Sequence, residues 1–92
     1  MSQTNFESID LVSIDGCAAN FEIAGTWKGE SFHIKIWCEY DGRDVESEIL
    51  SGECDPMKDW EAEPMFFDVL CQQEKFMKLY NQGYKAWEQM PK

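Results

Sequence analysis

The feature that most constrains this chain is a pair of alternating segments joined by Asp41-Gly42. In residues 32–40, apolar side chains alternate with charged or amphipathic ones, so one face of an extended strand is apolar and the other is mixed. In residues 44–49 three acids alternate with Val, Ser and Ile. Asp-Gly is a strong signal for a two-residue hairpin turn, because Gly adopts positive φ at no steric cost. The stretch therefore predicts a β-hairpin.

Two further strands are expected before this hairpin. Residues 7–14 alternate poorly, with Ile9 and Leu11 on one face and Val12 and Ile14 on the other. Residues 17–27 alternate well, with Ala19, Phe21 and Ile23 on one face. Within this second strand, Gly25 predicts a bulge or the end of regular pairing. Turns at Asp15-Gly16 and at Lys28-Gly29-Glu30 connect these strands, which predicts an antiparallel meander.

The remainder of the chain is expected to be an acidic link followed by a helix. In the link, Asp55 can cap a single helical turn that begins at Pro56, and Trp60 is expected to close one end of the core. The helix is expected to begin at Pro64, and Gly83 to divide it from a short terminal helix. Its apolar side chains recur at spacings of three and four, and they are Phe66, Val69, Leu70, Phe76, Met77, Tyr80, Tyr84 and Trp87.

These segments predict one α+β domain over residues 1–92. A four-stranded antiparallel meander sheet (1–52) is followed by the acidic link (53–63), and a helical cover (64–91) packs on one face of the sheet.

The charge is strongly and unevenly acidic. The net charge is −10, and residues 1–63 hold fifteen acids against four bases, while residues 64–92 hold three acids and four bases. Such a field opposes direct binding to DNA or to an anionic membrane, and it favours a basic protein partner. Plain solubility is the alternative explanation of the same charge.

The cysteines and the chain start bear on the compartment. Cys17, Cys38, Cys54 and Cys71 occur singly, without a C-x-x-C motif. Two disulfides would suit a secreted protein, but no leader or bilayer-spanning run is present, so we expect reduced thiols in a soluble intracellular protein.

The sequence contains no catalytic signature and calls for no cofactor or metal. His33 is the only histidine and lies beside Lys35 without the partners that a zinc site requires. Glu39, Asp41 and Asp44 match a fragment of a calcium loop, but the full pattern is missing, so they offer at most a weak cation site.

What remains is a surface for a partner. Same-face residues of a strand stand about 6.8 Å apart, so acids on the last strand would form a regular row of carboxylates. Nearby tryptophans suit a binding hot spot with a charged rim. The expected partner-binding residues are Trp27, Lys28, Trp37, Glu39, Asp41, Arg43, Asp44, Glu46 and Glu48.

This combination of small size, acidic balance, short-turned meander, C-terminal helix and missing active-site motif resembles small phage-encoded inhibitors of bacterial defence. These are the anti-CRISPR proteins and the anti-restriction DNA mimics. Length and layout are most similar to inhibitors of the type I-F CRISPR surveillance complex. The resemblance implies a non-catalytic inhibitor in the host bacterial cytoplasm. It would bind basic Cas subunits, could touch the guide RNA, and would block binding or hybridisation of target DNA.

These families share no signature, so no residue role carries over. Some such inhibitors bind through Lys and Arg, and Lys28, Lys35 and Arg43 could serve in that way. The alternatives are an anti-restriction DNA mimic and an immunity protein that neutralises a nuclease toxin. A small enzyme or metal-binding domain that uses the cysteines with His33, and a homodimer formed through exposed aromatics, are further alternatives.

Overall fold

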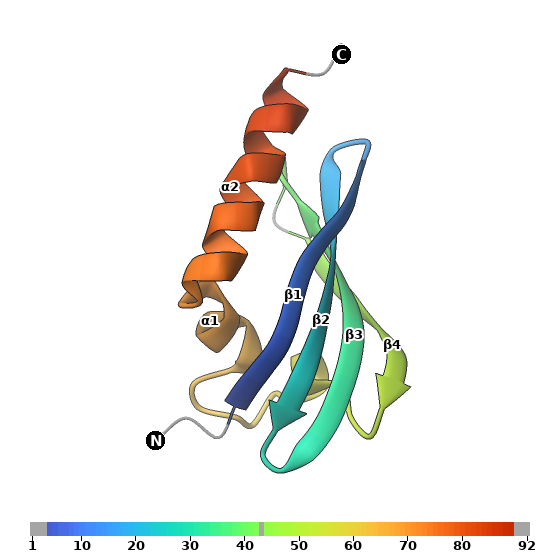
Figure 1. The fold of residues 1–92 in the computed structure, drawn as a ribbon, viewed down its shortest axis with the longest axis vertical. Helices are drawn as coiled ribbons and strands as arrows, with labels where there is room; N and C mark the ends of the chain where they lie inside the picture. Colours follow the sequence, from blue (N-terminus) through green and yellow to red (C-terminus); the bar gives the residue numbers. More distant parts are fainter. Residues whose placement is uncertain (1–3, 43, 90–92) are drawn as a thin grey trace.

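Four antiparallel strands form a single sheet in the order β1-β2-β3-β4. A computed structural model describes residues 4–42 and 44–89 of the chain. Figure 1 shows the sheet from its side, with the helices against one face. The predicted α+β meander with a helical cover is therefore confirmed. The strands are β1 (Thr4–Asp15), β2 (Ala18–Trp27), β3 (Glu30–Glu39) and β4 (Val45–Gly52).

Strands β2 and β3 form the centre of the sheet. Phe21 and Ile23 of β2 lie opposite Ile36 and Ile34 of β3, and all four side chains are buried. The residues between them are half-exposed on the opposite face. The period-two pattern therefore predicted the core face of both strands correctly, because successive side chains of a strand point to opposite sides.

Strand β1 contains two irregularities in its pairing with β2, and one of them corrects the predicted faces. The register shifts between Leu11 and Ser13, which makes Val12 an extra residue that is 54% exposed. Ile14 thereby returns to the face of Leu11, opposite the buried Ala19. The prediction that Val12 and Ile14 share a face is wrong, because one inserted residue reverses the alternation.

The other irregularity lies beside Gly25, where the register shifts between Phe6 and Ser8. A Cβ atom at Gly25 would collide with the backbone carbonyl of Asn5. The two strands therefore approach each other more closely than a side chain would allow. The irregular pairing predicted at Gly25 is confirmed.

The β2–β3 connection is a tight turn, as predicted. Lys28 and Gly29 both have positive φ, at 51° and 86°. Positive φ at both central residues is what a type I′ hairpin turn requires.

The β3–β4 connection differs from the predicted two-residue turn. It is a longer loop, closed by a hydrogen bond from the Glu39 amide to the Asp44 carbonyl at 3.1 Å, and Gly42 does not adopt a left-handed φ. The Tyr40 amide donates to the Cys17 carbonyl at 2.8 Å, so the loop is held against the β1–β2 turn. This contact between distant parts of the chain overrides the local turn preference. Arg43 lies outside the described residues.

The link contains the predicted helical turn. The Asp55 side chain accepts a hydrogen bond from the Met57 amide, and Pro56 occupies the first turn. Trp60 does not close the core as predicted, since it is 71% exposed. The helical segments after the sheet are η1 (Pro56–Lys58), α1 (Phe66–Cys71) and α2 (Glu74–Glu88).

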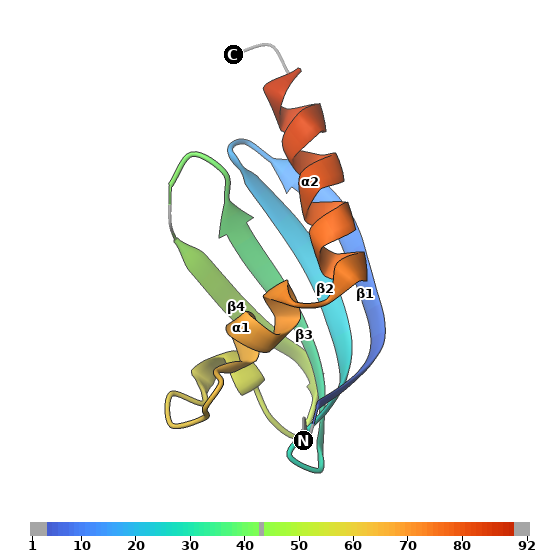
Figure 2. The same ribbon diagram turned by 90° about the vertical axis from the view of Figure 1, so that its left-hand side faces the viewer.

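The helical cover is two helices and not one continuous helix from Pro64. The break lies at Gln73, whose backbone is extended (φ −79°, ψ 121°). Figure 2 looks onto the cover, with α2 in front of β1 and β2 and α1 lower, toward β3 and β4. None of the helices in the described part of the chain is long and apolar enough to cross a membrane.

The cover buries its aromatic side chains against the sheet. The ring of Phe66 packs on Trp27 and Phe32, with centroids 5.4 and 5.2 Å apart, and Phe76 packs on Phe21 at 4.8 Å. Full burial of such a side chain stabilises the fold by about 1.5–3 kcal/mol. The predicted apolar stripe is therefore the part of the helices that covers the sheet.

Gly83 does not end a helix, contrary to the prediction. It is buried inside α2, and a Cβ atom there would collide with the Tyr40 hydroxyl and approach Leu11. Tyr40 donates a hydrogen bond to the Tyr80 carbonyl at 3.1 Å and packs edge-on against Tyr84. The glycine therefore makes room for the tyrosine that joins the end of β3 to the helix.

We predict that Gly83→Ala destabilises the protein although alanine favours helices. Overpacking costs about 1–3 kcal/mol, against about 1 kcal/mol of gained helix propensity. The free energy of unfolding, measured in denaturant, should fall by up to about 2 kcal/mol. In a Tyr40→Phe background, which removes the hydroxyl, the same substitution should be neutral or stabilising. Equal effects in both backgrounds would show that Tyr40 does not contact the glycine.

Candidate interaction surface

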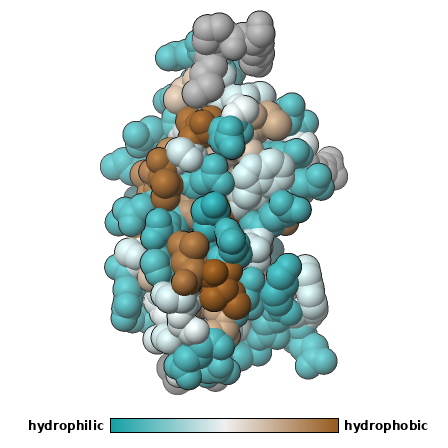
Figure 3. All heavy atoms as spheres, turned by 90° about the vertical axis from the view of Figure 1, so that its right-hand side faces the viewer, coloured by the Kyte–Doolittle hydropathy of each residue, from teal (hydrophilic) through white to brown (hydrophobic). Residues whose placement is uncertain are grey.

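The face of the sheet that points away from the helices has no covering element among the described residues. We call it the outer face. Figure 3 shows it as mostly hydrophilic, with small separate hydrophobic patches. Strand register places the following side chains on it: Asp10 of β1, Asn20 and Glu22 of β2, His33, Lys35, Trp37 and Glu39 of β3, and Glu46 and Glu48 of β4.

One row across this face contains more acids than bases. Asp10 lies opposite Glu22, Glu22 opposite Lys35, and Lys35 opposite Glu48. The Lys35 ammonium is 3.7 Å from the Glu48 carboxylate, and both side chains are well exposed. Such an exposed pair contributes little to stability. Its three acids outnumber its one lysine, so the row has a net negative charge that a cationic partner could neutralise.

The predicted carboxylate row lies at the free edge of the same face. Asp44, Glu46 and Glu48 are exposed, whereas Val45 and Ser47 between them are half-buried. The prediction that Glu46 and Glu48 share one side of the strand is confirmed, whereas Asp44 lies immediately before β4. In the described residues, Lys35 is the one cation within ion-pair distance of this row.

Trp37 is half-exposed on the outer face, between Asn20 and Glu46 in the register. This position leaves its side chain accessible, and its contact with a partner stays a prediction. Its indole sits among polar and acidic side chains, which is the setting in which an interface tryptophan combines apolar contact with a charged rim.

Trp27, in contrast, belongs to the core and not to a partner surface. It is 7% exposed, and its indole N–H donates to Asp59 Oδ2 at 2.9 Å. The Lys28 ammonium lies 2.9 Å from the same carboxylate and 5.7 Å from the Trp27 ring centroid. The hydrogen bond from Trp27 and then that from Lys28 lower the pKa of Asp59. These contacts anchor the link to the β2–β3 turn, so we remove Trp27 from the candidate surface.

Sequence reasoning missed a polar chain that crosses three strands of the outer face. His33 Nε2 lies 2.7 Å from Glu22 Oε1, and His33 Nδ1 lies 3.1 Å from Ser51 Oγ. The residues match the types of a Ser-His-Glu triad. Only the register of β2, β3 and β4 brings them together, so no sequence spacing could have indicated the group.

Two features of the described residues disfavour a hydrolase site at this polar chain. Two backbone amides shortly after Ser51, those of Glu53 and Cys54, donate to the Ser31 carbonyl, at 2.8 and 3.3 Å. They are therefore not directed at an oxyanion position. The histidine side chain is 36% exposed on an open sheet. The hydrogen bonds join three strands, which explains the arrangement without catalysis.

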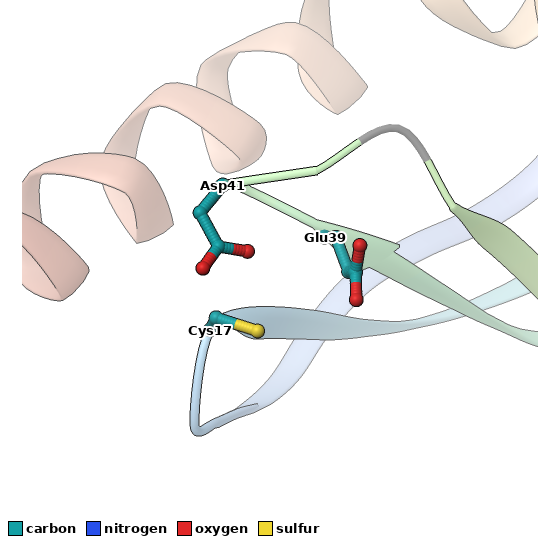
Figure 4. Close-up of side chains that lie close together, drawn as sticks. All are labelled: Cys17, Glu39 and Asp41. Atoms are coloured by element: carbon teal, nitrogen blue, oxygen red, sulfur yellow. The ribbon is translucent and has the colours of Figure 1, made fainter.

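The loops at one end of the sheet bring Cys17, Glu39 and Asp41 together. Their ligand atoms lie within 4.8 Å of one another, and Figure 4 shows the two carboxylates beside the thiol. A hydrogen bond to Asp41 is the main cause of the raised pKa of Cys17, followed by desolvation and by the charges of Asp41 and Glu39. The thiol therefore keeps its proton at neutral pH, which opposes metal binding through sulfur.

The other three cysteines are also poor nucleophiles. Together with Cys17 they are free thiols, as expected. Burial and then the neighbouring Cys71 raise the pKa of Cys38 to about 12. Desolvation is likewise the main cause of the raised pKa values of Cys54 and Cys71. Because the thiolate is the reactive form, this arrangement disfavours the alternative of a thiol-dependent enzyme.

Comparison of the chain with protein-family models, with curated proteins and with solved structures finds no match.

We predict that Asp41→Asn makes Cys17 more reactive. Removing the carboxylate removes the main cause of the raised pKa, so more thiolate forms at mildly alkaline pH. Alkylation of Cys17, followed by mass spectrometry of its peptide, should become several-fold faster. Asp44→Asn is the matched control, because it makes the same charge change outside the cluster. Equal rates in the two variants would show that Asp41 does not contact the thiol.

Proposed function

We propose that this protein is a non-catalytic inhibitor whose acidic outer face binds a basic surface of a nucleic-acid-handling complex. The particular target that we propose is a type I-F CRISPR surveillance complex, on which the protein would block the binding or hybridisation of target DNA. The partner surface would consist of Cas residues that otherwise contact nucleic acid. The effect would be stoichiometric, because occlusion consumes one inhibitor for each site.

The observation that supports this proposal is the exposed row of carboxylates at the start of β4. Asp44, Glu46 and Glu48 are exposed in succession along one side of the chain. Same-side residues of a strand are about 6.8 Å apart, and successive phosphates of one DNA strand are about 3.4 Å apart along the axis. Both therefore present evenly spaced negative charge, which a basic groove built for phosphates could accept.

The surrounding side chains support binding to protein more than binding to nucleic acid. Glu39 adds a further acid on β3, and Trp37 offers a flat apolar contact beside Glu46. Lys28 and Lys35 are each engaged with an acid, Asp59 and Glu48 respectively. A basic binding surface made from these lysines therefore has less support than an acidic one.

The same surface would suit an anti-restriction DNA mimic or an immunity protein for a nuclease toxin. These alternatives share the chemistry of the partner, a basic protein surface that handles nucleic acid. They differ in the identity of the partner, so a capture experiment separates them. Recovery of a restriction enzyme or of a nuclease toxin would favour the corresponding alternative.

We predict that the triple variant Asp44→Asn, Glu46→Gln, Glu48→Gln binds the purified surveillance complex more slowly than the unmodified protein. Removing three charges that steer association should lower the association rate about tenfold at low salt and flatten its salt dependence. Surface plasmon resonance at several ionic strengths measures both effects.

The matched control is the triple variant Asp68→Asn, Glu74→Gln, Glu88→Gln, which removes the same charge from exposed helical positions. Thermal unfolding of all variants verifies that the fold is kept. The proposal requires the control to bind like the unmodified protein. Equal slowing by both triple variants would reduce the effect to net charge, and capture of no nucleic-acid-handling complex from a host lysate would refute the proposal.

A further inference from the structure

The outer edge of β4 is an open strand edge. In the described sheet, β4 pairs with β3 alone. The Glu39 amide donates to the Asp44 carbonyl, which assigns these two residues to a hydrogen-bonded pair. Antiparallel pairs alternate, so the backbone groups of Val45, Ser47 and Ile49 point away from β3. Their N–H and C=O groups therefore line the open edge.

The side chains beside this edge differ on its two sides. On the helix side, Val45 is half-buried and Ile49 is 51% exposed, although Ile49 lies opposite the fully buried Ile34. The apolar layer of the sheet thus continues to the edge and is left uncovered there. On the outer side, Glu46 and Glu48 are exposed. The edge is therefore acidic on the outer side, and on the helix side it has two apolar residues, Val45 and Ile49, on either side of Ser47, whose hydroxyl is bonded to Asp55.

A second copy of this chain is a poor occupant of the edge. Strands that pair share their faces, so two β4 strands would place Glu46 and Glu48 of one copy next to those of the other. Like charges on directly opposed strand residues are destabilising, and charged side chains commonly protect edge strands from pairing with themselves. The same acids would attract a strand of opposite charge.

We propose that β4 binds an extended segment of a partner protein in which Lys or Arg alternates with apolar residues. The segment adds a fifth strand to the sheet. Its basic side chains meet Glu46 and Glu48 on the outer face, and its apolar side chains cover Val45 and Ile49 on the other. The backbone hydrogen bonds provide affinity, and the alternation provides specificity. This proposal rests on the basic partner of the proposed function and specifies how that partner is held.

Ser47 offers a substitution that tests the edge without breaking the sheet. Its N–H points to the open side, so proline there removes an edge donor and keeps the ladder with β3. The Ser47 hydroxyl donates to Asp55 Oδ2 at 2.9 Å, and Ser47→Pro loses this bond as well. Ser47→Ala loses the same bond and retains the N–H, which makes it the matched control.

The probe is an end-blocked eight-residue peptide of alternating lysine and valine, which matches the length of β4. We expect it to slow hydrogen exchange at the Val45, Ser47 and Ile49 amides of the intact protein. Ser47→Pro should weaken peptide binding by about tenfold or more, whereas Ser47→Ala should change it little. A peptide of alternating glutamate and valine should not bind.

Three results would overturn the inference. The first is equal binding of the peptide to both Ser47 variants, because the attraction would then be charge alone. The second is unchanged exchange at the edge amides when the peptide is bound. The third is a dimer in sedimentation that Ser47→Pro dissociates, because the occupant would then be a second copy.

The outcome is separable from that of the proposed function. If the unmodified protein captures no nucleic-acid-handling complex but the peptide binds in a way that Ser47→Pro abolishes, the edge inference stands and the proposed function fails. If the surveillance complex binds both Ser47 variants equally while the carboxylate triple variant is impaired, the proposed function stands and the edge inference fails.

Discussion

Burial of aromatic side chains between the helices and the sheet is the interaction on which the rest of the structure depends. Phe66 packs among rings from β2 and β3, and Phe76 packs on Phe21. A domain of this size has one modest core, so these contacts carry a large share of the stability. They also commit one face of the sheet to the interior. The choice of this face as the core determines which side chains of the sheet are left at the surface.

The helical cover leaves the outer face and the β4 edge open. Polar side chains on the outer face satisfy one another, as in the chain of hydrogen bonds from Glu22 through His33 to Ser51. Among the described residues, the one cation within ion-pair distance of the β4 acids is Lys35, whose ammonium is 3.7 Å from Glu48. The features available to a partner are therefore a charge pattern on the outer face and a row of backbone groups on the edge. The proposed function uses the charge pattern, and the strand addition at β4 uses both.

Contacts between elements distant in sequence override the local helix and turn propensities at several positions. Tyr40 reaches from the end of β3 to α2, and Gly83 remains inside the helix because its missing Cβ makes room for the tyrosine. The loop after Tyr40 is held against the β1–β2 turn, which replaces the expected tight turn at Asp41-Gly42 and brings Cys17 to Asp41. Helix and turn propensities of about 1 kcal/mol are too weak to resist such packing.

The sequence by itself determined the meander, the core faces of β2 and β3, and the exposed acids of β4, because side-chain alternation and short connections are local properties of the chain. It did not determine the helix break at Gln73, the burial of Trp27 in place of Trp60, or the meeting of Glu22, His33 and Ser51. Those features depend on strand register and on how the helices fit a twisted sheet. Both arise from contacts between residues far apart in the chain, and only the tertiary structure decides them.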